Sequence, residues 1–324
     1  MHPAFSVIFL TTLLGIGQGL FMALITAQTY TRVELIHVEE PARFYAIGAL
    51  LVLVFVALAL FASFFHLGRP ERAWRTPSQW RTSWLSREVI ALPTFGAIVF
   101  IYGLIHWFGL DFEVVKIGGF SVSLSLLIGI IGVAASLTLF LCTGMIYACI
   151  RFLQEWATPL TVVNFVMLGL ASGFTVATVY ATFSAPNLIN MFGGWAIVFT
   201  AVAGITRISA LIRNARIKPK STATTAIGVR HSKIRQTAQG AMGGSFNTRE
   251  YFHGKPASFL RLVKWGFLTM VFVIPLILLA LGLYKKVAVV ILLAAVIQYI
   301  GLLMERWFFF AQARHPQNIY YQTA

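Results

Sequence analysis

The sequence has few charged residues. Of its 324 residues, 11% are charged and 58% are hydrophobic, whereas a soluble domain typically carries about 25% charged residues. Only ten residues are acidic, and the net charge is +15. The basic residues stand in short polar stretches between long apolar runs, which is typical of polytopic membrane proteins. This pattern excludes a soluble enzyme and argues against nucleic-acid binding.

Cysteine is also scarce. Cys142 and Cys149 are the only two, and no Cys-x-x-Cys motif is present. This chain therefore cannot hold an iron–sulfur cluster or a cysteine-ligated zinc ion by itself. The two are seven residues apart in one apolar run, so we interpret them as small packing residues on one helical face.

The sequence also lacks two histidines at the same depth in the membrane, and it lacks charged residues in the middle of its apolar runs. A haem held between helices needs two axial ligands at similar depth, but His66 ends one apolar run at one membrane face and His106 ends the next at the other. We therefore expect no haem. A transporter usually carries polar features near the midplane, where Gln18 stands almost alone, so transport remains only an alternative.

Eight apolar runs are each long enough to cross a bilayer as a helix, which takes about 20 residues. The sequence thus predicts a single all-α integral membrane domain. The first run lacks a charged leader and is interpreted as a retained helix, and Pro275 predicts a kink in the seventh. The expected helices are 5–29, 43–65, 88–108, 121–149, 159–183, 190–213, 261–284 and 287–311.

Charge asymmetry predicts the orientation. If the amino terminus is cytoplasmic, 20 of the 25 Lys and Arg residues fall on the cytoplasmic side, with Arg207 and Arg306 counted among them at helix ends. The positive-inside rule then places both termini in the cytoplasm. The segment 214–260 becomes a long cytoplasmic loop.

The polar segment 66–88 is the most informative stretch. It contains five arginines and three tryptophans, with His66 and Glu88 at its ends. Titratable groups at the lipid boundary are costly and therefore usually serve a function such as proton transfer. Histidine titrates near neutral pH. A quinone needs an apolar cleft, hydrogen-bond donors and a protonatable group, and this segment can supply all three. The predicted quinone-binding residues are His66, Glu88, Ser86, Arg87 and Arg72.

Simpler interpretations of the same residues stay open. The arginines can serve as headgroup contacts and topology signals. Ser83 or Ser86 can cap the third helix, and Glu88 can be favoured by its dipole. As a docking surface for soluble partners we predict basic and aromatic residues of the polar loops, the residue types that anchor interfaces. They are Arg69, Arg75, Arg81, Arg151, Phe246, Arg249 and Tyr251.

Two motifs carry a family resemblance. The run His66-Leu-Gly-Arg-Pro-x-Arg-Ala, followed by Ser83-Trp-Leu-Ser-Arg-Glu88, resembles the membrane-anchor subunit of dimethyl sulfoxide reductase-type molybdoenzymes. The run Met145-Ile-Tyr-Ala-Cys-Ile-Arg151 with the following Trp-x-Thr-Pro is similar to the start of that family's second half.

The resemblance implies a complex of three parts. A catalytic subunit holds the molybdopterin, a ferredoxin-like subunit holds iron–sulfur clusters, and the anchor exchanges electrons with quinone and carries no cofactor of its own. His66 and Glu88 match the residues tied to the family's quinone site. The count of Lys and Arg places the 66–88 segment on the cytoplasmic side. For this reason the chain most resembles the cytoplasmic-facing sulfite dehydrogenase branch of the family.

These observations together predict a quinone-reactive anchor in the bacterial inner membrane, without a catalytic centre of its own. Its partners on the cytoplasmic side oxidise sulfite, and ubiquinone or menaquinone is the exchangeable substrate. A quinol-oxidising anchor of a sulfoxide or sulfur-oxyanion reductase is the alternative within the class. A transporter or a passive scaffold is the alternative outside it.

Overall fold

The computed structural model describes the chain except residues 118–119, 221, 230, 232, 235–251 and 320–324. Eight helical segments in the described residues are long and apolar enough to cross a membrane, as the sequence predicts. They are α1 (Phe5–Arg32), α2 (Pro41–Phe64), α3 (Trp84–Trp107), α4 (Leu124–Ala148), α5 (Pro159–Ser184), α6 (Ile189–Ala215) with the 3-10 turn η2 (Pro186–Leu188) before it, α9 (Ala257–Leu268) continuing into α10 (Ile274–Lys285), and α11 (Ala288–Ala311).

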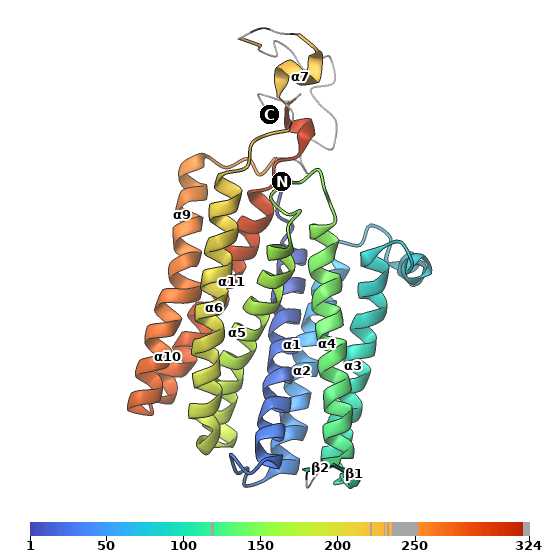
Figure 1. Ribbon diagram of the computed structural model, residues 1–324, viewed down its shortest axis with the longest axis vertical. Helices are drawn as coiled ribbons and strands as arrows, with labels where there is room; N and C mark the ends of the chain where they lie inside the picture. Colours follow the sequence, from blue (N-terminus) through green and yellow to red (C-terminus); the bar gives the residue numbers. More distant parts are fainter. Residues whose placement is uncertain (118–119, 221, 230, 232, 235–251, 320–324) are drawn as a thin grey trace.

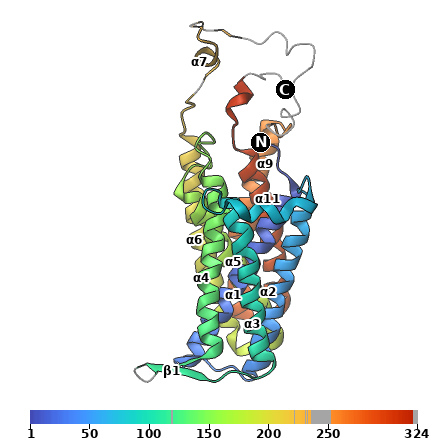
Figure 2. The ribbon, with the colours of Figure 1, turned by 90° about the vertical axis from the view of Figure 1, so that its right-hand side faces the viewer.

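The helices run side by side as one bundle (Figure 1). The amino end of α1 and the carboxyl end of α11 lie at the same end, which we call the upper end. A 3-10 segment, η1 (Pro70–Gln79), lies across the upper ends of α2 and α3 (Figure 2). Further upper-end elements are the short helix α7 (Ala223–Ile227) and the turn η4 (Pro316–Ile319).

Helix α1 is the most buried span and packs against α2, α4, α5 and α11. It crosses α5 at very short range, because Gly15 and Gly19 face Gly169 and Gly173. A Cβ atom at Gly173 would lie 2.2 Å from the carbonyl carbon of Gly19. Small residues four apart permit such close backbone approach between membrane helices. This crossing joins the first four helices to the rest of the bundle.

Three predicted helix starts differ from the structure by three residues or more. The seventh helix begins at Ala257 rather than at residue 261. The third helix begins at Trp84 rather than at residue 88, because Ser83 caps it by accepting a hydrogen bond from the Ser86 N–H at 3.3 Å. The fourth begins at Leu124 rather than at residue 121. The preceding residues form strand β2 (Phe120–Ser123), paired antiparallel with β1 (Glu113–Ile117). This lower-end hairpin is an exception to the all-α prediction.

The seventh span is interrupted just before Pro275. A π-helical turn, η3 (Thr269–Val273), separates α9 from α10. Proline has no N–H to donate to the carbonyl four residues earlier, so the helical ladder is rearranged at this point. A π turn therefore stands just before Pro275, where the sequence predicts a kink.

Candidate functional site

The candidate site lies at the upper end, where the 66–88 segment meets the bundle. Ser83 caps α3, which begins at Trp84, so Glu88 is the fifth residue of the helix rather than its first. The expectation that Glu88 opens the helix was wrong for this reason. One turn inside the helix, its carboxyl group points into the bundle and not toward the headgroups.

Glu88 is buried, with 8% of its surface exposed. Its Oε1 accepts a hydrogen bond from the Thr143 hydroxyl of α4, which is itself buried. Ser86 is buried close by in the first turn of α3. A carboxyl group inside a membrane protein is costly and usually marks an ion or proton pathway. Glu88 therefore has the setting of a proton-exchanging group, and Thr143 is the partner that sequence analysis missed.

His66 lies in the turn that follows α2, and its backbone N–H donates to the Ser63 carbonyl at 3.3 Å. Partial burial lowers the pKa of the ring below the ordinary value of about 6.5. Within the described residues, no hydrogen bond or ion pair joins His66 to Glu88. The structure thus brings both groups to the upper end. The His66 ring is partly exposed to water and the Glu88 carboxyl group lies inside the bundle, with no hydrogen bond between them.

The arginines of the segment divide into two groups. Arg87 is held by the loop itself, because Nε donates to the Trp80 carbonyl and Nη2 to the Arg81 carbonyl, each at 2.8 Å. Its guanidinium also lies 4.2 Å from the ring centre of Trp84. Arg87 therefore fixes the loop onto α3 and has little capacity left for a ligand.

The other arginines of the segment are exposed. Arg72 makes a loose ion pair with Glu71 at 4.0 Å. Arg75 and Arg81 lie over the rings of the neighbouring tryptophans at 5.2 and 5.3 Å. Arg69 and Arg151 are exposed as well. Exposed arginines and tryptophans on η1 form a surface suited to headgroups or to a partner. Phe246, Arg249 and Tyr251 lie outside the described residues.

A second charged cluster was missed by sequence reasoning. Glu305 of α11 pairs with Arg207 of α6 at 2.7 Å and with Arg306 at 3.5 Å, and all three are at most 3% exposed. The Arg306 guanidinium lies 3.7 Å from the ring centre of Phe165. The charge count treats both arginines as helix-end residues, but the structure buries them. The sequence carries no local signal for this pairing, because Arg207 and Glu305 stand on different helices.

The fold and the site together define a polytopic membrane subunit with a buried carboxyl group near one membrane face, beneath an exposed basic loop. The model of the DMSO reductase anchor subunit (DmsC) family matches residues 1–311, and the chain belongs to this family. An anchor subunit attaches other subunits of its enzyme to the membrane, so this chain has partner subunits. The chain is also 53% identical to a sulfite dehydrogenase subunit of Allochromatium vinosum, over all of this chain and 99% of that protein.

Proposed function

We propose that this chain is the quinone-reactive anchor of a sulfite-oxidising molybdoenzyme complex. The full-length similarity to a sulfite dehydrogenase subunit supports the choice of sulfite. In this scheme a molybdenum subunit oxidises sulfite, and a ferredoxin-like subunit passes two electrons through its iron–sulfur clusters. The anchor delivers them to a quinone.

The buried Glu88 carboxyl is the observation that carries the quinone site. Reduction of a quinone to a quinol consumes two electrons and two protons, so the protein must bring protons to the ring. Glu88, held by Thr143, is placed to exchange protons inside the bundle, while His66 exchanges them with water at the upper end. Ser86 and Arg72 are the further proposed contacts. Arg87 acts by holding the loop.

We place the upper end on the cytoplasmic side of the bacterial inner membrane. The excess of Lys and Arg on this side supports the orientation. Protons for the quinol then come from the side on which sulfite oxidation releases them, so the reaction moves no net charge across the membrane. Arg69, Arg75 and Arg81, on and beside η1, form with Arg151 the proposed docking surface for the iron–sulfur subunit.

A quinol-oxidising role remains the second candidate, because the family model is that of a DMSO reductase anchor. The same carboxyl group would then accept protons instead of donating them. The partner subunit's substrate distinguishes the two directions.

The test is to purify the complex through a tag on this chain and to measure its molybdenum and both reactions. The sulfite hypothesis predicts stoichiometric molybdenum and sulfite-dependent reduction of a short-tailed quinone. Quinol-dependent reduction of dimethyl sulfoxide, without sulfite oxidation, would establish the second candidate. A tagged chain that brings down no molybdenum protein would contradict both.

A further inference from the structure

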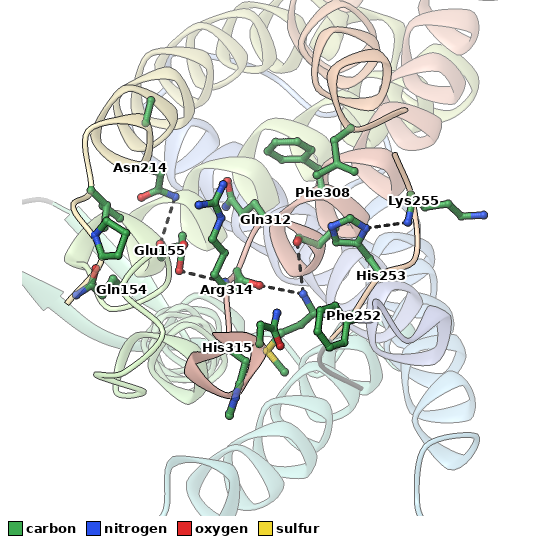
Figure 3. A pocket seen from close by; sticks show the side chains of 18 of the residues that line it. Gln154, Glu155, Asn214, Phe252, His253, Lys255, Phe308, Gln312, Arg314 and His315 are labelled. Atoms are coloured by element: carbon green, nitrogen blue, oxygen red, sulfur yellow. Dashed lines mark hydrogen bonds between the residues drawn. The ribbon is translucent and has the colours of Figure 1, made fainter. Parts of the chain in front are cut away.

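A large cavity lies at the upper end, away from the Glu88 site. Its volume is about 1010 Å³. It is bordered by the ends of α6, α9 and α11 and the turn after α4, and also by Met1, residues 252–255 and the residues that follow α11 (Figure 3). Leu211, Leu260 and Phe308 give it apolar walls. Lys220, Arg261 and Lys264 give it a basic lining. A cavity of this kind suits an amphiphile with a negative head.

The basic groups of this cavity have no acidic partner among the residues that the structure describes. Within the described residues, Lys220, Arg261 and Lys264 form no ion pair. Arg261 and Lys264 are three residues apart on α9, so they lie on one helical face. The lining also contains one acidic residue, Glu155. Its Oε2 accepts a hydrogen bond from the Arg314 backbone N–H at 3.4 Å. Figure 3 shows Lys255 extending away from the other labelled side chains.

The buried cluster of Arg207, Glu305 and Arg306 lies close to the cavity walls. Leu211 follows Arg207 by about one turn on α6, and Phe308 follows Glu305 by about one turn on α11. The cluster has two guanidinium groups and one carboxylate, so it carries excess positive charge in a region from which water is excluded. A negative group in the cavity would offset that charge.

The flanks of the cavity are apolar and exposed. Ile208 and Ile212 of α6 and Leu262 and Trp265 of α9 are exposed apolar residues at the same level as the lining. Figure 2 shows the upper ends of α6 and α9 apart from each other. In its lower part α6 packs instead against α10. Acyl chains can therefore lie along α6 and α9 while a headgroup occupies the space between their ends.

We propose that this cavity binds one anionic phospholipid, with its phosphate at Arg261 and Lys264. Lys220 completes the basic lining, and the acyl chains follow the apolar surfaces of α6 and α9. The lipid fixes the splayed ends of these helices and compensates the buried arginines. Basic pockets between membrane helices are a recurrent site for such headgroups.

Native mass spectrometry of the tag-purified complex, with this full chain in place, tests the proposal. After delipidation, phosphatidylglycerol or phosphatidylethanolamine of identical acyl chains is added back, and inorganic phosphate is tested separately. We expect one saturable phosphatidylglycerol adduct. The R261Q/K264Q variant should weaken its binding roughly 30-fold, as expected for two surface charges near a headgroup.

The matched control is R216Q/K218Q, which removes two exposed charges at the same end outside the cavity lining. It should bind phosphatidylglycerol like the parent. Equal binding of both phospholipids, equal loss in both variants, or phosphate binding as tight as that of phosphatidylglycerol would overturn the proposal. A complex whose cavity is filled by a partner protein and takes up no lipid would overturn it too.

Discussion

Thr143 of α4 donates a hydrogen bond to the buried carboxyl group of Glu88 on α3. This contact joins the two helices at the upper end and fixes the direction of the carboxyl group inside the bundle. Without it, Glu88 would be a buried carboxyl group with no hydrogen-bond donor among the described residues. The relationship makes Thr143 a positioning residue for the proposed quinone site.

Replacement of Thr143 by valine keeps the shape of the side chain and removes the donor. Leaving the buried carboxyl oxygen without its donor costs about 1–3 kcal/mol, so we expect quinone turnover to fall roughly tenfold. T143S should restore most of the activity because it restores the hydroxyl. T138V is the control, since Thr138 donates only to the Ala134 carbonyl of its own helix. Equal losses in T143V and T138V would refute the positioning role.

His66 predicts a pH dependence of quinone reduction. Its pKa is lowered by partial burial. The protonated ring, which is the form that donates a proton, is therefore fully populated only well below pH 6.5. The rate of quinone reduction is therefore expected to be highest in acid and to decline as pH rises through that lowered pKa. The H66Q variant should lack this step in its pH profile. A profile identical to that of the parent would remove His66 from the proton path.

Glu305 predicts a large effect on stability. Removing the carboxylate leaves Arg207 and Arg306 buried without their partner, which typically costs about 3–5 kcal/mol. E305Q should therefore lower the midpoint of thermal unfolding in detergent by several degrees. The exposed Glu113, 3.9 Å from Lys116, supplies the control E113Q, for which a shift near zero is expected. An unshifted E305Q midpoint would show that the cluster contributes nothing to stability.

The crossing of α1 and α5 predicts intolerance to a single methyl group. G173A places a Cβ atom 2.2 Å from the Gly19 carbonyl carbon, so the helices must separate, at a cost of several kcal/mol. We expect a strong loss of folded protein, measured by size-exclusion chromatography in detergent. G194A should be neutral, because a Cβ atom there meets nothing within 4 Å. A monodisperse G173A protein at parental yield would contradict the close crossing.

Much of the fold could be predicted from the sequence, because membrane spans are determined by local apolar length. Helix starts were less predictable. Ser83 and Ser86 are equally good caps by residue type, and only the structure shows that Ser83 is used. Strand β2 runs directly into α4 and contributes Phe120 and Val122 next to it, so an average of hydropathy over a window of residues does not mark the boundary.

The site could be predicted only in part. The residue types at His66 and Glu88 indicate titratable groups at one face, but side-chain direction depends on packing between helices distant in sequence. Thr143 is 55 residues from Glu88, and Arg207 is 98 residues from Glu305. Such pairs leave no local pattern. Arginines near the ends of helices, such as Arg207 and Arg306, look like topology signals in the sequence, and only the packing shows that they are buried.

The most direct test is to replace Glu88 by glutamine in the assembled complex. The amide keeps the size of the side chain and cannot exchange a proton, so we predict a roughly 100-fold loss of sulfite-dependent quinone reduction. Sulfite oxidation with a soluble artificial electron acceptor should be unchanged, and E71Q, an exposed glutamate of the same segment, should behave like the parent. Parental rates of quinone reduction in E88Q would contradict the proposed site.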